Sequence, residues 1–207
     1  MVYKMSLDHV EVELLVKPFG RGLHEGSDTY GTVIGLQVAT QTKPLEWQPP
    51  LGDMEPHTLN VVLPGHVADN MYSYVETKVA DPQVYPGDRN CIGFALASAG
   101  IVPPAYNPHH LQTLLSPAAD DTTPVNHSEL EPGGAYGMAD NTQGIRHMFV
   151  GLPDKDAHLA IRCVGGPLEV RSTAKVTAVW GSERLYHVTQ MPVAWKRPPR
   201  DTGPFSG

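Results

Sequence analysis

The sequence has little cysteine, few charged residues and no long hydrophobic run. Two cysteines among 207 residues, Cys91 and Cys163, are too few for a disulfide framework. No apolar stretch approaches the roughly 18 residues of a membrane span, and the chain start lacks the basic segment and apolar run of a Sec-type signal. These absences predict a soluble protein that is cytoplasmic at synthesis, with no membrane partner.

Positive charge is also scarce, because 15 lysines and arginines face 22 acidic residues and the formal net charge is −7. A protein that binds a phosphate backbone normally shows the opposite balance, so nucleic acid is not expected as a partner. Glycine and proline are abundant, at 20 each. This composition favours short elements and ordered loops over long helices.

Hydrophobic periodicity predicts a mixed fold of class α+β. Alternating segments predict strands at 7–16 and 30–40, and a short β-rich run follows at 59–63. Helical spacing predicts a helix near 66–79, and the alanine-rich run from Cys91 to Ala99 predicts a buried helix that ends at Gly100. Six further short strands are expected at 135–138, 148–152, 159–164, 169–171, 176–180 and 185–188. A helix followed by a strand meander is an α+β plan.

The chain divides into three expected parts. Residues 1–63 form a β-rich segment of unknown role, which contains an irregular connector rich in proline at 41–57. Residues 64–195 form the main domain, in which 105–131 is mostly loop with one helical turn near 109–115. Residues 196–207 form a flexible tail.

Cys91 opens the buried helix, and this position suits a nucleophile. The helix dipole favours a thiolate there, and the Cys91 N–H can point at a developing oxyanion. A base must come from another element. His147 is the candidate, because it begins an apolar strand and would lie at the sheet rim. The alternatives are an inert core cysteine and a histidine that only solvates a strand end.

Three motifs in this order resemble NlpC-type cysteine peptidases. Asn90-Cys91-Ile92-Gly93-Phe94, with Gly-Ile and a proline after the helix, is similar to the family's Asp-Cys-Ser-Gly-Phe helix start. The segment 130–138 (LEPGGAYGM) resembles its Leu-x-Pro-Gly-Asp strand, and 146–152 (RHMFVGL) resembles the strand with its catalytic histidine. Asn90, Ile92 and Gly134 depart from the family pattern. Asn90-Cys91 is also similar to the vitamin-A-acyltransferase-like and amidase branches of papain-like folds.

The resemblance implies a papain-like domain in which a helix carrying Cys91 packs on an antiparallel sheet. It implies a cysteine amidase or endopeptidase that cleaves peptidoglycan stem peptides, with Cys91 and His147 as catalytic residues. The family's oxyanion tyrosine has two candidates here, Tyr74 and Tyr85, and Asn90 is a further substrate or oxyanion residue. No cofactor or metal is implied.

The third catalytic residue is expected on the next strand, where His158, Ala160 and Arg162 share one face. With a tight turn, His158 lies opposite Gly151, about 13 Å along the strand from His147. A longer or bulged loop would be needed for a hydrogen bond. We take His158 as the third residue because an arginine cannot accept the imidazole N–H, and a plain strand-start histidine is the alternative.

Alternation along the strand that carries His158 turns Cys163 toward the apolar layer. This predicts a core cysteine that is not a disulfide partner of Cys91.

The remaining polar clusters have weaker patterns. His109-His110, Asp120-Asp121 and His127 lack the spacing that places zinc ligands on one face, so a solvated loop is expected instead.

Two other functions compete with wall cleavage. One is a deamidase, acyltransferase or isopeptidase that acts on an intracellular substrate from the same scaffold. The other is a non-catalytic structural or binding module. Because the sequence lacks an export signal, a wall hydrolase would need a carrier, such as a phage particle or a contractile secretion apparatus, or a lysis event, and an immunity protein is a conceivable partner.

Overall fold

The computed structural model describes residues 8–19, 29–47, 54–104, 122–140, 144–154, 156–180 and 184–190. The expected helical turn near 109–115 and the tail 196–207 lie outside these ranges. The described elements are β1 (His9–Pro18), β2 (Gly31–Val38), β3 (Leu45–Glu46), β4 (His57–Pro64), α1 (Gly65–Lys78), η1 (Pro86–Asp88), α2 (Cys91–Ser98), β5 (Thr122–Val125), η2 (His127–Glu129), β6 (Ala135–Asp140), β7 (Gly144–Gly151), β8 (Ala157–Ile161), β9 (Leu168–Ser172), α3 (Thr173–Trp180) and β10 (Arg184–Val188).

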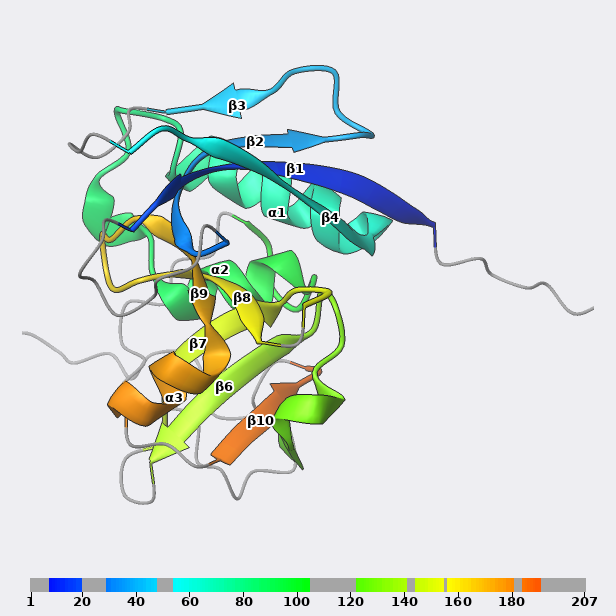
Figure 1. Ribbon diagram of the computed structural model, residues 1–207, viewed down its shortest axis with the longest axis vertical. Coiled ribbons are helices and arrows are strands. Elements are labelled where there is room, and N and C mark those ends of the chain that lie inside the picture. Colours follow the sequence, from blue (N-terminus) through cyan, green and yellow to red (C-terminus); the bar gives the residue numbers. More distant parts are fainter. Residues whose placement is uncertain are drawn as a thin grey trace, which may run out of the picture.

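The described strands form one ten-stranded sheet in the order β4-β1-β2-β9-β8-β7-β6-β10-β5, with β3 beside β2. Neighbouring strands pair antiparallel throughout. The fold is therefore mixed α+β with an antiparallel sheet and few helices, as expected at this coarse level. Figure 1 shows β1 to β4 with α1 in one layer of the molecule, and β6 to β10 with α3 in another.

The N-terminal strands β1 to β4 and the later strands belong to the same sheet. The junction is the antiparallel pairing of β2 with β9, in which Gly31 lies opposite Val170 and Thr32 opposite Glu169. The Tyr30 hydroxyl also donates to the Asp156 carboxylate at 2.8 Å. The N-terminal segment thus continues the main sheet and shares its core.

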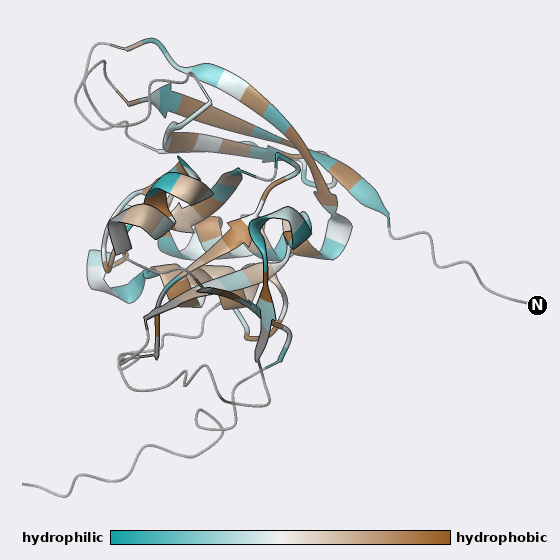
Figure 2. Ribbon diagram, turned by 60° about the horizontal axis from the view of Figure 1, so that its bottom comes forward, coloured by the Kyte–Doolittle hydropathy of each residue, from teal (hydrophilic) through white to brown (hydrophobic). Residues whose placement is uncertain are grey.

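The strands of this N-terminal part alternate between core and solvent. On β1, Val12, Leu14 and Val16 are buried, whereas Glu11 and Glu13 are exposed. Figure 2 shows hydrophobic and hydrophilic residues alternating along these strands. This alternation of buried and exposed side chains is expected for a sheet with one solvent-exposed face.

The helices α1 and α2 lie close to their expected positions. In α1 the residues at helical spacing, including Val67, Met71 and Val75, are buried. Every residue of α2 is buried, and the helix is followed by Gly100 at φ +75°, a conformation that glycine adopts without a Cβ penalty. No helix of the described residues is long and apolar enough to cross a membrane.

The expected strand at 176–180 is wrong, because Thr173–Trp180 forms the helix α3. β-branched residues in this segment favour a strand in isolation. In the fold, the Asp156 carboxylate accepts a hydrogen bond from the Ala174 N–H at 3.1 Å, and the Thr173 N–H donates to the Asp156 carbonyl at 2.6 Å. These contacts satisfy the first amides of the helix, so tertiary structure overrides local propensity.

The described part of 105–131, expected as loop, contains a strand and a 3-10 turn. β5 pairs with β10, and η2 follows it. The connector 41–57 likewise contains the short strand β3, which pairs with β2. Both strands are short, and β5 contains a proline, so neither has a strong periodic pattern.

The helices α2 and α3 pack on opposite faces of the later strands. On β7, Met148 and Val150 belong to the core cluster that contains α2, whereas Phe149 belongs to the cluster that contains Val176 of α3. On β8, Leu159 and Ile161 face α2, and Ala160 belongs to the α3 cluster. This division decides where each candidate site residue points.

Candidate functional site

Asn90 caps the helix that begins at Cys91. Its backbone is extended, at φ −153° and ψ 165°, and its side-chain oxygen accepts a hydrogen bond from the Gly93 N–H at 2.8 Å. This is the usual way in which asparagine satisfies an orphan amide at a helix start. The side-chain oxygen of Asn90 is therefore engaged in the cap, which gives this residue a structural role in addition to the expected oxyanion role.

Of the two candidate tyrosines, Tyr74 adjoins Cys91. Its hydroxyl accepts from the Asn90 N–H at 3.3 Å and lies 3.4 Å from the Asn90 carbonyl, and its ring packs edge-on against Phe94 with centroids 5.4 Å apart. Burial raises the pKa of Tyr74 to about 12, so its hydroxyl stays protonated at neutral pH. Tyr85 lies just before η1 and is 74% exposed. Solvent surrounds most of its side chain, so it is less suited than Tyr74 to the predicted oxyanion role.

The Cys91 thiol is buried, with an exposed fraction of 9%. Burial raises its pKa, although hydrogen bonds from the backbone of Met148, Ile92 and Cys91 itself act in the opposite direction. The net direction of this pKa is opposite to the one expected at a helix start, because desolvation is larger than the three backbone contributions. The sulfur nevertheless lies where several amides converge.

Cys91 and Met148 of β7 belong to the same core cluster, close to where β7 stops pairing with β8. Pairing between these strands covers Val150 with Leu159 and Gly151 with His158. In an antiparallel ladder Met148 would be the next residue of β7 to pair on this side, opposite Ile161. The Met148 backbone instead acts to lower the pKa of the Cys91 thiol, against the larger effect of burial.

His147 precedes Met148, so its backbone adjoins the thiol. The side chain points elsewhere: His147 pairs with Met138, which belongs to the α3 cluster, and its ring centroid lies 6.2 Å from that of His158. The expected direct facing of Cys91 and His147 is therefore wrong for this conformation, since α2 packs on the other face.

His147 is buried, with an exposed fraction of 4%. Burial lowers its pKa to about 4, and the nearby positive charge of Arg171 acts in the same direction. The ring is therefore neutral at pH 7, which is the form that can accept a proton.

His158 does not hydrogen-bond His147, so its expected orienting role is wrong in this structure. Its Nδ1 lies 3.0 Å from the Thr173 hydroxyl, and its Nε2 is buried with no hydrogen-bond partner among the described residues. The physical reason is the register, because His158 lies opposite Gly151, four residues along β7 from His147. Burial holds the pKa of His158 well below its usual value, with smaller contributions from His147 and Arg171.

Sequence reasoning missed the charged residues that surround these two histidines. Arg171 lies opposite His158 on β9, and its guanidinium is 3.7 Å from the buried carboxylate of Glu169. Both residues share the α3 face by alternation along β9. The pattern Glu-x-Arg in a short strand was the available signal, but exposed charges on a wet face give the same pattern.

Asp156 was also missed, although it joins three elements. Its carboxylate accepts hydrogen bonds from the Tyr30 and Ser172 hydroxyls, each at 2.8 Å, and from the Ala174 N–H. These bonds outweigh burial and lower the pKa of Asp156.

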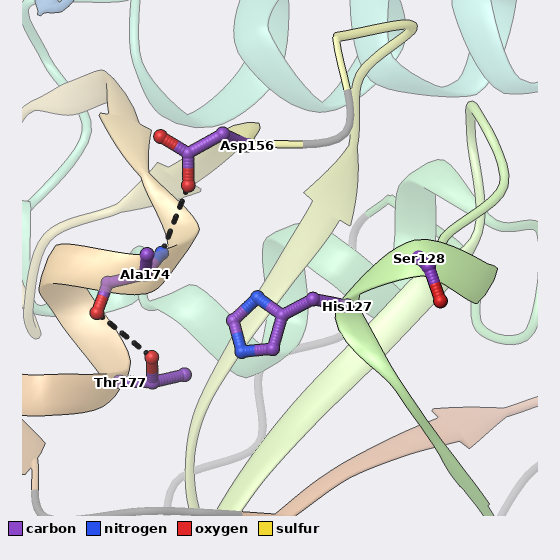
Figure 3. A pocket seen from close by; sticks show the side chains of 5 residues that line it. All are labelled: His127, Ser128, Asp156, Ala174 and Thr177. Atoms are coloured by element: carbon purple, nitrogen blue, oxygen red, sulfur yellow. Dashed lines mark hydrogen bonds between the residues drawn. The ribbon is translucent and has the colours of Figure 1, made fainter.

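Beside Asp156 lies an open cavity of about 410 Å³, lined by His127, Ser128, Asp156, Ala174 and Thr177. Figure 3 shows the His127 ring projecting from η2 toward α3. Neither Cys91 nor His147 lines this cavity.

Cys163, expected in the core, is exposed. β8 ends at Ile161, and Cys163 begins a turn in which the Gly166 N–H donates to the Cys163 carbonyl at 2.9 Å. The strand alternation that predicted burial therefore no longer applies at this residue.

Comparison of the chain with protein-family models, with curated proteins and with solved structures gives no significant match in any of the three.

Proposed function

We propose that this protein is a cysteine hydrolase with a divergent papain-like domain, in which Cys91 is the nucleophile and His147 the general base. The observation that carries the proposal is the position of Cys91 at the buried start of α2, in one core cluster with Met148, the strand residue that follows His147. The chain order supports it as well, since a helix with the cysteine precedes two adjacent strands that each carry a buried histidine.

In the proposed reaction the neutral His147 imidazole takes the Cys91 proton as the sulfur attacks an amide carbonyl. Backbone N–H groups at the start of α2 stabilise the oxyanion, and the imidazolium then protonates the leaving amine. Water attacks the resulting thioester, with His147 again acting as the base, and releases the acid. Because burial raises the pKa of Cys91 and lowers that of His147, the proton moves during attack rather than beforehand.

The proposal requires a rearrangement of β7 around His147. The His147 ring lies on the α3 face beside His158, and rotation about the Cα–Cβ bond keeps a strand side chain on its own face of the sheet. The backbone near the register shift at Met138 and Ala139 must therefore move when substrate binds for the ring to reach Cys91.

The substrate class comes from the resemblance to NlpC-type peptidases. It is a peptide of the bacterial cell wall, with the bond between D-glutamate and diaminopimelate as the first one to test.

The test is digestion of purified peptidoglycan, with muropeptide products identified by mass spectrometry. We expect cleavage by the native chain, a loss of at least about a hundredfold in Cys91→Ala and His147→Ala, and no loss in the matched control Cys163→Ser. Products that are unchanged by Cys91→Ala, or no cleavage by a folded sample, would overturn the proposal.

A second candidate, a non-catalytic binding or structural module, is favoured by the facing of His147 away from α2. In such a module the thiol is only a core residue. Alkylation of Cys91 at neutral pH, followed in native protein and in His147→Ala, separates the two functions. A rate unaffected by His147→Ala supports the module, and a slower rate in the variant supports the hydrolase.

A further inference from the structure

The turn that contains Cys163 lies beside the start of α2. The hairpin of β8 and β9 closes with a hydrogen bond from the Arg162 N–H to the Pro167 carbonyl at 3.0 Å, and residues 163–166 form the turn. The Gly165 N–H donates to the Arg89 carbonyl at 2.9 Å, and the Arg89 guanidinium donates to the Gly165 carbonyl at 3.0 Å. Arg89 is two residues before Cys91, and Gly165 is two residues after Cys163.

The two bonds between Arg89 and Gly165 therefore hold the segments of the two cysteines side by side. Ile161, two residues before Cys163, belongs to the same core cluster as Cys91. The electrostatic coupling agrees with this placement: burial is the main reason for the raised pKa of Cys91, and the Cys163 thiolate makes a further contribution.

We propose that Cys163 and Cys91 form a disulfide when the protein meets a peroxide. Cys163 is the exposed partner, so it reacts with the oxidant first. The geometry needed for a disulfide is narrow, and the turn contains two adjacent glycines, Gly165 and Gly166, that permit the local adjustment.

The chemistry balances with hydrogen peroxide as the oxidant. The Cys163 thiolate attacks one peroxide oxygen, the O–O bond breaks, and water leaves after protonation, which gives a sulfenic acid at Cys163. The Cys91 sulfur then attacks the Cys163 sulfur, the S–O bond breaks, and the Cys91 proton leaves with the hydroxide as a second water. The two thiols supply the two electrons that reduce the peroxide.

This inference does not depend on catalysis, because it needs only the proximity of the two sulfurs. If Cys91 is also the nucleophile, the disulfide blocks it, and a thiol reductant restores activity. The modification would then switch the proposed hydrolase off under oxidising conditions.

The test treats the full chain with hydrogen peroxide and maps unreduced peptides by mass spectrometry. We expect one intramolecular crosslink between the peptides of Cys91 and Cys163, loss of both free thiols and reversal by dithiothreitol. Cys91→Ser and Cys163→Ser should each abolish the crosslink, and circular dichroism of both variants checks that they fold. Arg89→Ala, which removes the guanidinium contact to the turn, should slow crosslinking several-fold.

A sulfinic acid at Cys163 with an intact Cys91 thiol would overturn the proposal, as would a disulfide that links two chains. Wall digestion by the reduced protein is measured separately. A crosslink without digestion therefore contradicts only the hydrolase, and digestion without a crosslink contradicts only the disulfide.

Discussion

At the scale of single residues, the two cysteines occupy contrasting environments. Cys91 is buried at the start of α2 with a raised pKa, whereas Cys163 is exposed in a turn. Because the thiolate is the reactive form, reactivity depends on both exposure and pKa. The two residues therefore differ in reactivity, and the exposure of Cys163 is the opposite of what its sequence pattern predicts.

We expect iodoacetamide to label Cys163 faster than Cys91 at neutral pH, by on the order of tenfold or more, since each unit of pKa changes the thiolate fraction tenfold. Peptide mass spectrometry at several reaction times measures both rates in one sample. Unfolded protein is the control and should show similar rates at the two sites. Equal rates in the native protein would contradict the buried position of Cys91.

Tyr74 gives a second prediction at this scale. Tyr74→Phe removes the hydroxyl that contacts the Asn90 N–H and carbonyl while it keeps the ring against Phe94. We expect a loss of about 1 kcal/mol in the free energy of unfolding, measured by urea denaturation. Tyr85→Phe, at an exposed position, is the matched control and should leave stability unchanged within error.

At the scale of elements, the start of α2 depends on its cap. Asn90→Ala removes the side-chain oxygen that accepts from the Gly93 N–H and should cost about 1 kcal/mol of stability, whereas Asn90→Asp retains an acceptor and should cost less. Thermal denaturation followed by circular dichroism compares the two. Equal losses in both variants would show that the cap bond does not stabilise the helix.

Some elements could be predicted from the sequence because their local pattern agrees with their tertiary role. α1 and α2 have helical spacing or a continuous apolar run with a glycine stop, and β1 alternates cleanly. α3 could not be predicted, since its first amides depend on Asp156, which lies in a different hairpin. For the candidate site, the sequence predicted that Cys91 begins a helix, which the structure confirms, but the direction of His147 depends on its pairing with Met138, which periodicity does not specify.

At the scale of the whole molecule, β2 and β9 join the N-terminal strands to the rest of the sheet. We expect a fragment of residues 64–195 to fold poorly, because it leaves β9 without its neighbour and removes the Tyr30 bond to Asp156. The measurement is the dispersion of its amide NMR spectrum relative to the full chain. A well-dispersed spectrum from the fragment would instead support the expected independent domain.

The buried histidines predict a pH dependence of global stability. The pKa of His147 falls from 6.5 in the unfolded chain to about 4 in the fold, so the unfolded state binds the proton more tightly. Stability is therefore fully present above pH 6.5 and declines as the pH falls toward 4, by roughly 3 kcal/mol for this residue alone. The pKa of His158 is also lowered in the fold, so this residue contributes to the decline in the same direction.

Urea denaturation at a series of pH values measures this decline. His147→Gln should flatten the curve between pH 6.5 and 4, whereas the exposed His9→Gln should not. A flat profile in the native protein would contradict the buried, neutral state of His147.

The pairing of β2 with β9 has a consequence for biosynthesis. A ribosome synthesises Gly31 long before Val170, its partner in the antiparallel pairing of β2 with β9. The edge of β2 therefore stays unpaired while most of the chain is still being made. Contacts between residues so distant in sequence are slow to form, and an unpaired strand edge can associate with other nascent chains. Yield during expression should therefore fall when translation outpaces chaperone capacity, and cooler growth should recover it.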